Sequence, residues 1–478
     1  MSSDTQKGAP RWSRYGLKGD PYFVDALEPD EDALYPITLF VGRDEERGKI
    51  EPLIRDNDRS ATLVHAEGGH GKTTLANRVA HDVEDEAVLV TPEEVQLASD
   101  NMSFRFFRDV LSGILSALTD AGHELPEPPA DPKDDPDSDY PALLEARRLV
   151  QVVRRRSGYS AGGQVAGVGG QSGVDHAYME PTYEPGTSRQ LLTDVAREVG
   201  ILGYEGILVR VNNLDEMARS HPDKLDTFLG ESRDLFKIPG IHYLLLGNLE
   251  VRTAIESIPR VRGCFDLPIP LNPFDEEQVL EILEERYDHF ARDGDWTPPV
   301  SDEVVHRLHR VHYGDLGNIL ADLGRCVQAV QTIEAEPIGV ADALPVLQDV
   351  YLSMIGDQLT EELWETIEVM ADKQESVRQV DLREDLDLTA PAVNQRFQKL
   401  QEADAIELSH REGASKYFRL TSAARFALAG KLQQARAGSS GGYGTETFGT
   451  STFGTGGKGE SEAADIPGVL DDALVDNE

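Results

Sequence analysis

The spacing of hydrophobic residues along the chain changes at about residue 270. Before that point, short apolar runs at residues 61–64, 207–211 and 241–246 alternate with stretches in which apolar residues recur at helical spacing. Continuous apolar runs are typical of strands buried on both faces of a parallel sheet. From residue 271 to about residue 356 only the helical spacing remains. The pattern therefore predicts an α/β domain followed by an all-α domain.

Pattern and composition together divide the chain into segments. Polar, mixed sequence at the start predicts a flexible arm, and the glycine-rich and then acidic sequence at the end predicts a disordered tail. The predicted segments are an arm at 1–35, an α/β domain at 36–270 with a glycine-rich insertion at about 157–188, a helical domain at 271–356, a further domain at 358–430 and a tail at 438–478.

The segment 358–430 has the pattern helix–helix–helix–hairpin–helix. Thr389 and Pro391 are typical of an N-cap and a first helical turn, so they predict the start of the third helix. Two short apolar runs follow, at residues 406–410 and 416–420, with a turn at Glu412 and Gly413. This order predicts a winged helix-turn-helix domain, whose third helix would enter a DNA major groove.

A phosphate-binding loop follows the first apolar run and precedes a helical stretch. Its glycines would let the backbone amides surround an anion at the helix N-terminus. Lys72 would reach the β- and γ-phosphates of ATP, and the Thr73 hydroxyl would bind Mg²⁺. Ala66 stands where the pattern G-x-x-x-x-G-K-[ST] has its first glycine. The predicted cofactor-binding residues are Ala66, Glu67, Gly68, Gly69, His70, Gly71, Lys72, Thr73 and Thr74.

Such a loop also needs an acidic residue at the end of a neighbouring strand, to hold Mg²⁺ and to polarise water. Counting from the strand at 207–211 places Asn212 at the metal-holding position, whereas residue chemistry favours Asp215 and Glu216. Both alternatives stay open. We expect Asp215 and Glu216 to be the catalytic carboxylates, with Asp215 joining Thr73 as a metal ligand. The alternative is that they cap the next helix.

Three further polar residues are candidates for catalysis. Asn248 follows the strand at 241–246 and could orient the attacking water, although an Asn at this place is often only a turn former. Arg260 and Arg262 lie beyond it and could neutralise transition-state charge across a subunit interface. The alternative for both arginines is a place on the surface.

The order of these features resembles that of AAA+ ATPases of the origin-recognition and replication-initiator type. The resemblance covers about residues 40–429 and rests also on the segments FVGRDEE at 40–46 and LNPFDEEQV at 271–279. It implies a P-loop NTPase parallel sheet of the AAA+ type, an all-α lid and a winged helix. It also implies ATP and Mg²⁺ as cofactors and a homo-oligomer formed through the AAA+ modules. Family members carry a lid arginine where this chain has Gly317, which predicts slow hydrolysis.

Charge modifies this picture. The chain of 478 residues has 86 acidic and 46 basic residues and a net charge of −40, which is typical of a protein from a cytosol of very high salt. An ordinary acidic protein is the alternative. The two cysteines are too few for a disulfide framework, and no apolar run is long enough to span a membrane, so we expect a cytoplasmic protein.

Charge within the C-terminal domain is less acidic than elsewhere. Between residues 389 and 420 there are five basic and four acidic residues. A local basic balance in an acidic chain favours double-stranded DNA as the partner. The predicted DNA-binding residues are Asn394, Gln395, Arg396 and Lys399 on the third helix, with Arg411 and Lys416 on the hairpin.

These features together predict an ATP-binding protein that hydrolyses ATP slowly and whose nucleotide state controls DNA binding, as a replication initiator or a DNA-associated regulator. Two alternatives stay open. One is a signal-transducing ATPase of the STAND type, in which the winged helix makes protein contacts or oligomers. The other is an adaptor in which the nucleotide is only structural.

Overall fold

The computed structural model describes residues 11–30, 32–84, 87–97, 102–128, 138–160, 185–330, 336–373, 376–413 and 415–440. Residues 161–184 of the predicted glycine-rich insertion and residues 441–478 of the predicted tail lie outside this description. The chain forms two compact units, one of Asp25–Asn272 and the other of Met1–Val24 with Pro273–Glu478.

Unit Asp25–Asn272 is built on a parallel sheet, as the apolar runs predicted. In the described residues the sheet has six strands in the order β2-β4-β5-β1-β6, and β3 also pairs with β4. The predicted runs at 61–64, 207–211 and 241–246 all lie in central strands. The strands are β1 (Ser60–His65), β2 (Val88–Val90), β3 (Val95–Gln96), β4 (Gly206–Asn212), β5 (Ile241–Gly247) and β6 (Ile269–Pro270).

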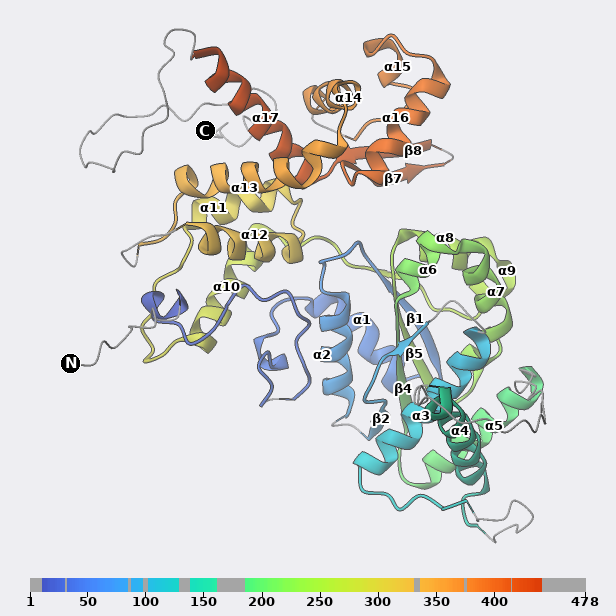
Figure 1. The fold of residues 1–478 in the computed structure, drawn as a ribbon. Coiled ribbons are helices and arrows are strands. Elements are labelled where there is room, and N and C mark those ends of the chain that lie inside the picture. Colours follow the sequence, from blue (N-terminus) through green and yellow to red (C-terminus); the bar gives the residue numbers. More distant parts are fainter. Residues whose placement is uncertain are drawn as a thin grey trace, which may run out of the picture. The chain divides into compact units, whose positions relative to one another are not determined.

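Helices cover both faces of this sheet (Figure 1). Alternate strand residues point to opposite faces, so Leu208 and Leu244 pack with α1 (Asp44–Arg55) and α2 (Lys72–Glu84). Their neighbours in the strands, such as Val209 and Tyr243, pack on the other face. That face is covered by α3 (Met102–Asp120), α4 (Pro141–Ser160), α5 (Pro185–Ile201) and α7 (Pro222–Ser232). Burial on both faces is the reason that most residues of these strands are apolar.

Short elements complete this unit at the ends of the strands. Helix α6 (Leu214–Ser220) follows β4, and α8 (Leu249–Ser257) and α9 (Pro259–Arg262) follow β5. The 3₁₀ turns Ile37–Leu39 and Leu235–Lys237 precede α1 and β5. Because the strands are parallel, their carboxyl ends and the loop after β1 meet at one edge of the sheet. The phosphate-binding loop and the predicted acidic residues therefore lie at the same edge.

From residue 273 onward the second unit first forms only helices, as the change of spacing at residue 271 predicted. Its helices are α10 (Glu276–Phe290), α11 (Asp302–Val311), α12 (Leu316–Ala329) and α13 (Val340–Ile355), with a 3₁₀ turn at Gly356–Gln358. Asp275 and Gln278 form a reciprocal capping box at the start of α10. Gly317 lies in the first turn of α12.

Residues 11–24 are not a flexible arm, so the prediction for this part of the chain is wrong. Arg11–Tyr15 form a 3₁₀ turn, and Tyr22 is buried with its hydroxyl 2.8 Å from the hydroxyl of Tyr287. Arg286 of α10 donates to the carbonyl oxygens of Pro21 and Phe23. The segment has no periodic pattern of its own, and it is ordered by a helix more than 200 residues away in the sequence.

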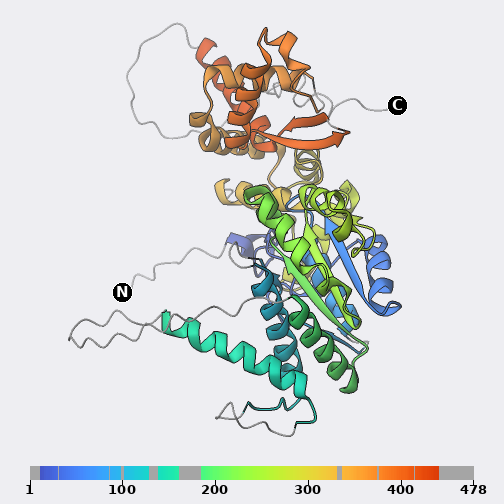
Figure 2. The ribbon, with the colours of Figure 1, turned by 90° about the vertical axis from the view of Figure 1, so that its right-hand side faces the viewer.

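The C-terminal part has the predicted order of three helices, a hairpin and a final helix. The antiparallel hairpin pairs Ile406 with Leu420 and Arg411 with Lys416. Helices α14–α16 lie on the same side of this hairpin in both views (Figures 1 and 2). The elements are α14 (Glu361–Asp372), α15 (Leu382–Asp385), α16 (Ala390–Glu402), β7 (Ile406–Glu412), β8 (Ser415–Leu420) and α17 (Ser422–Ser440).

Candidate functional site

The predicted phosphate-binding loop connects β1 to α2. Gly69 and Gly71 have φ angles of 77° and 78°, a left-handed backbone that favours glycine, and they turn the chain closely before α2 begins at Lys72. The first amides of a helix have no acceptor inside the helix, and they carry its positive dipole end. The start of α2 therefore has the donors that an anion needs.

Lys72 lies inside this loop. Its ammonium donates to the carbonyl oxygens of Ala66, at 2.7 Å, and of Glu67, at 2.9 Å. The same nitrogen forms an ion pair with Asp215 Oδ2 at 3.0 Å. Ala66 contributes its backbone, since its amide also donates to the carbonyl oxygen of Gly247, while its methyl group packs in the buried cluster. An alanine can therefore stand where the sequence pattern has a glycine.

Arg43, from the segment FVGRDEE, binds the backbone of this loop at His70. Its guanidinium donates to the carbonyl oxygen of His70 at 3.2 Å and to that of Asn272 at 2.6 Å, and it pairs with Glu46 at 3.2 Å. Arg43 is buried, and the desolvation lowers its pKa. Sequence reasoning singled out this segment without assigning a role, and the structure shows that Arg43 fixes the loop backbone.

The structure resolves which residue ends the strand β4. Asn212 is the last residue of the strand, and its Nδ2 atom lies 3.4 Å from Thr73 Oγ1. Asp215 lies one turn later, in α6, on the side of Lys72. The position beside Thr73 is thus held by an amide and the position beside Lys72 by a carboxylate.

Asp215 and Glu216 have different surroundings. Burial raises the pKa of Asp215, and the nearby Lys72 ammonium acts against that rise. The second carboxylate oxygen of Asp215, Oδ1, is buried and has no hydrogen-bond partner in the protein. Glu216 is exposed to solvent. Of the two predicted carboxylates, only Asp215 is placed beside Lys72.

The other predicted catalytic residues have local roles. Asn248 is buried, and its Oδ1 accepts hydrogen bonds from the amides of Glu250 and Val251 at 3.1 Å each. It therefore caps α8. The sequence had offered a turn former as the alternative to catalysis, and its role in orienting water stays a prediction. Arg260 and Arg262 are exposed on α9, so their proposed action on a neighbouring subunit stays a prediction.

Glu94 was missed by sequence reasoning. Its Oε2 accepts a hydrogen bond from Asn212 Nδ2 at 2.6 Å, and its Oε1 is buried without a partner. Glu94 lies between β2 and β3, two strands of three and two residues, which are too short to show a pattern. The available signal was the acidic pair Glu93–Glu94, which follows the apolar run Val88–Val90 after Thr91 and Pro92.

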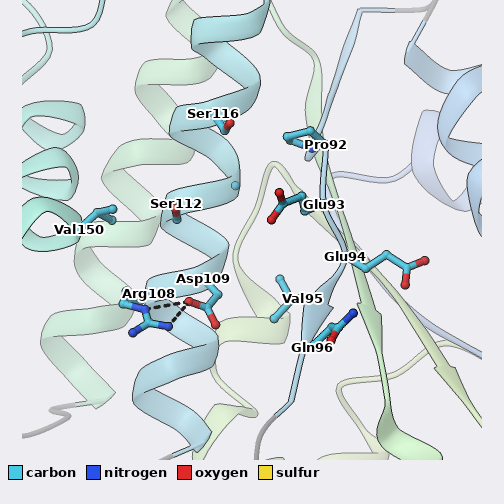
Figure 3. A pocket seen from close by; sticks show the side chains of 11 residues that line it. Pro92, Glu93, Glu94, Val95, Gln96, Arg108, Asp109, Ser112, Ser116 and Val150 are labelled. Carbon is cyan, nitrogen blue, oxygen red and sulfur yellow. Dashed lines mark hydrogen bonds and ion pairs between the residues drawn. The ribbon is translucent and has the colours of Figure 1, made fainter. Parts of the chain in front are cut away.

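A cavity next to Glu94 is separate from the predicted phosphate-binding loop. A cavity of about 830 Å³ lies between the segment Pro92–Gln96, α3 and Val150 of α4 (Figure 3). Its lining includes Glu93 and Glu94 but no residue of the phosphate-binding loop. A phosphate site is a shallow surface of backbone amides and need not be a deep cavity, so the candidate anion site is located by the geometry of the loop.

The predicted DNA-binding residues are only partly presented to solvent. Arg396 donates to Glu365 Oε2 at 3.0 Å and to Thr366 Oγ1 at 3.1 Å, and its side chain is 14% exposed. The prediction that it faces a groove together with Lys399 is wrong, because its long side chain binds α14 instead. The exposed predicted residues are Asn394, Gln395, Lys399 and Lys416. Arg411 lies on β7, and its side chain is outside the description.

Comparisons with known proteins give structural similarity only. No family model and no curated protein matches the sequence. Similar solved structures include the Aeropyrum pernix ORC2 protein (ADPNP-ADP complexes), with 13% identity over 89% of this chain and 100% of that chain and a TM-score of 0.45. The Aeropyrum pernix ORC1 protein in complex with DNA has 13% identity, 84% and 96% coverage and a TM-score of 0.39. The Thermotoga maritima RuvB Holliday junction branch migration motor has 12% identity, 83% and 95% coverage and a TM-score of 0.35.

At these identities and TM-scores the similarity assigns no function and no residue role to this chain. The α/β fold, a parallel sheet with the predicted phosphate-binding loop directly after β1, rests on the strand order and on the element order of this chain. In the part of the chain that is described, no helix is long and apolar enough to cross a membrane.

Proposed function

We propose that this protein binds ATP with Mg²⁺ at the loop Ala66–Thr74 and hydrolyses it slowly. The observation that carries the proposal is the placement of Lys72 between the loop carbonyl oxygens and Asp215, at the N-terminus of α2. A lysine at the centre of a turn of left-handed glycines, followed by a hydroxyl at Thr73, matches what a triphosphate requires.

The residues present fit a magnesium nucleotide. Asp215 Oδ1 and Glu94 Oε1 are buried without partners, and both are acceptors of the kind that Mg²⁺ or its bound water takes. No group of three or more acidic, His or Cys side chains that could hold a metal alone occurs among the described residues. A divalent cation here would therefore need phosphate oxygens, which is how Mg²⁺ commonly binds with nucleotides. Bound Mg²⁺ would supply charge neutralisation at the phosphates.

The chain's own groups divide the work of binding and catalysis. The amides at the start of α2 and the Lys72 ammonium would bind the phosphates, and Thr73 would offer its hydroxyl to the cation. Asp215 forms an ion pair with Lys72, so it would accept a hydrogen bond from the attacking water. Asn212 and Asn213, at the end of β4, carry no charge that could do this. Weak activation of water is the physical reason to expect slow turnover.

The test is ATP-dependent stabilisation of the folded protein. ATP with Mg²⁺ should raise the melting temperature of the wild type, because a ligand that binds only the folded state stabilises it. Lys72→Ala should lose this rise, since the amides alone do not balance the β/γ charge. Lys49→Ala is a matched control, because Lys49 lies on the exposed side of α1. Equal stabilisation of Lys72→Ala and wild type would overturn the proposal.

We further propose that the nucleotide state controls binding of double-stranded DNA by the C-terminal helices and hairpin. What supports this is the exposure of Asn394, Gln395 and Lys399 on α16 and of Lys416 on the hairpin. Asn and Gln side chains can read base edges, and lysines can contact phosphates. The alternative is a signal-transducing ATPase whose C-terminal domain makes protein contacts. A DNA titration at molar salt, with and without ATP, distinguishes the two.

A further inference from the structure

The metal-holding position at the end of β4 contains an asparagine that is turned the wrong way to bind a cation. Asn212 Oδ1 accepts a hydrogen bond from the amide of Asn213 at 2.8 Å. This bond fixes the amide orientation, so Nδ2 faces Thr73 and Glu94. An NH₂ group has no lone pair to offer a metal. Asn212 therefore occupies the position without supplying a ligand.

Glu94 brings a carboxylate to the same place. Its Oε2 is bound to Asn212 Nδ2 at 2.6 Å, which leaves Oε1 buried and without a protein partner. A buried carboxylate oxygen that accepts no hydrogen bond is costly, and a cation or its bound water removes that cost. Asn212 thus links Glu94 on one side to the Thr73 hydroxyl on the other.

The backbone near Glu94 is fixed on both sides. Val95 and Gln96 pair with Val211 and Asn212 in the sheet. On the other side, Arg210 donates to the carbonyl oxygens of Thr91 and Pro92, at 3.0 and 2.9 Å. Arg210 is itself buried and also binds Asn77 of α2. Glu94 is therefore placed by the sheet and by a buried arginine.

We propose that Glu94 replaces the strand-end acid and supplies the carboxylate that holds Mg²⁺ beside Thr73. Asn212 is then a positioning residue, which holds Glu94 through its NH₂ group. The carboxylate comes from the segment between β2 and β3 and reaches the site across the end of β4. This proposal rests on the proposed function, because Mg²⁺ reaches the site with the nucleotide.

Glu93 provides a matched control. It carries the same charge, one residue earlier, but Figure 3 shows it pointing toward α3, whereas Glu94 points to the opposite side of the strand. Replacement of either residue by Gln removes one charge and keeps the size of the side chain. Gln at position 94 can still accept the hydrogen bond from Asn212, so the local fold keeps this contact.

The experiment is calorimetric titration with a non-hydrolysable ATP analogue, once with Mg²⁺ and once with EDTA. Wild type and Glu93→Gln should bind at least about tenfold more tightly with Mg²⁺ than with EDTA. Glu94→Gln should lose about tenfold in affinity with Mg²⁺ and nothing in EDTA, as expected when a group that supports the metal is removed. The melting temperature of each nucleotide-free variant shows whether the fold is intact.

A second variant moves the carboxylate from position 94 to position 212. A gain of metal binding in that variant cannot be caused by unfolding. The double variant Glu94→Gln with Asn212→Asp returns the acid to the strand end, and it should regain most of the Mg²⁺ enhancement. Mn²⁺ in place of Mg²⁺, detected by electron paramagnetic resonance with the analogue present, should show bound metal in wild type and the double variant and less in Glu94→Gln.

The outcomes separate this proposal from the proposed function. If wild type binds no analogue in either condition, the proposed function itself fails. If wild type binds and Glu94→Gln keeps its full Mg²⁺ enhancement and its bound Mn²⁺, Glu94 does not hold the metal. A loss of equal size with Mg²⁺ and with EDTA would show that Glu94 only supports the structure, and this too overturns the inference.

Discussion

At the end of β4, two asparagines stand where an ATPase with a phosphate-binding loop needs acidic residues. Each has a local structural role: Asn212 links Thr73 and Glu94, and Asn213, with φ of 64°, precedes α6 in a left-handed conformation. The turn that they form brings Asp215 to Lys72. The strand end itself therefore carries no acidic residue. The carboxylates near the loop come from Asp215 in α6 and from Glu94 instead.

This arrangement predicts different effects for two neighbouring carboxylates. Asp215→Asn should bind ATP but hydrolyse it about 100-fold more slowly, because removal of a group that accepts a proton from water costs on that order. Glu216→Gln should keep the wild-type rate, since Glu216 is exposed on α6. Steady-state phosphate release and ATP binding, measured on both variants, check this. A slow Glu216→Gln beside a fast Asp215→Asn would reverse our assignment.

A second prediction at this scale concerns pH. His242 is buried beside Ser60 Oγ, 2.9 Å from its Nδ1, and burial lowers its pKa from 6.5 to about 4. Between these two values the unfolded chain binds a proton that the folded chain excludes, so stability falls as pH falls through that range and is constant above it. At pH 5 this single group should cost about 2 kcal/mol relative to pH 7.5.

Denaturant unfolding at pH 7.5 and pH 5 measures the effect. His242→Gln should lose less stability on acidification than the wild type, whereas His221→Gln, at an exposed position, should behave as the wild type does. His65 is also buried, with its pKa lowered to about 4 by burial, so part of the pH dependence should remain. An identical pH dependence in His242→Gln and the wild type would contradict this cause.

At the scale of elements, contacts between α16 and its neighbour α14 decide which polar residues of α16 remain exposed to solvent. Val393, Phe397 and Leu400, spaced three and four residues apart, form its buried side. Arg396 lies between that side and solvent, and its guanidinium binds Glu365 and Thr366 of α14. Arg396 and Lys399 are three residues apart, so helical spacing places them on one face of α16. The sequence did not show that α14 packs close enough to bind Arg396 while Lys399 stays exposed.

The two residues should therefore respond differently to substitution. Lys399→Ala should weaken binding to duplex DNA and leave the melting temperature unchanged. Arg396→Ala should lower the stability of the C-terminal domain by about 1 kcal/mol, because the Glu365 partner is solvent-exposed, with a smaller effect on DNA binding at low temperature. Fluorescence anisotropy with a duplex and thermal unfolding separate the effects. A loss of DNA binding in Arg396→Ala without a change in stability would contradict this assignment.

The whole molecule carries a net charge of −40, and this should decide how it responds to salt. Repulsion among the acidic residues acts across the surface over the Debye length, which falls from about 10 Å at 0.1 M salt to about 3 Å at 1 M. Compact states with a high net charge are destabilised by this repulsion. Screening should therefore favour the folded chain.

We expect the melting temperature to rise between about 0.1 M and about 2 M potassium chloride. Sucrose at matched osmolality is the control, because it stabilises by exclusion from the surface and does not screen charge. A larger rise in potassium chloride than in sucrose would support the electrostatic cause. No rise, or a fall, would contradict it and remove the basis for adaptation to high salt.

The sequence alone determined the elements whose patterns are local. Apolar runs located β1, β4 and β5, because a strand covered on both faces has few polar residues. Glycines followed by Lys72 and Thr73 located the phosphate-binding loop, because few other residues allow that backbone. Thr389 and Pro391 correctly located the start of α16. In each case the signal lies within a few residues of the element that it specifies.

Only the tertiary structure decided which distant residues meet. Residues 11–24 are ordered by α10, Arg396 is taken up by α14, and Arg43 fixes a loop about thirty residues away, and none of these contacts has a local pattern. Glu94 reaches Asn212 because a two-residue strand pairs with the end of β4. Pairing between strands depends on the whole sheet. A local pattern therefore located the glycine-rich loop, whereas the carboxylates around that loop were decided by the tertiary structure.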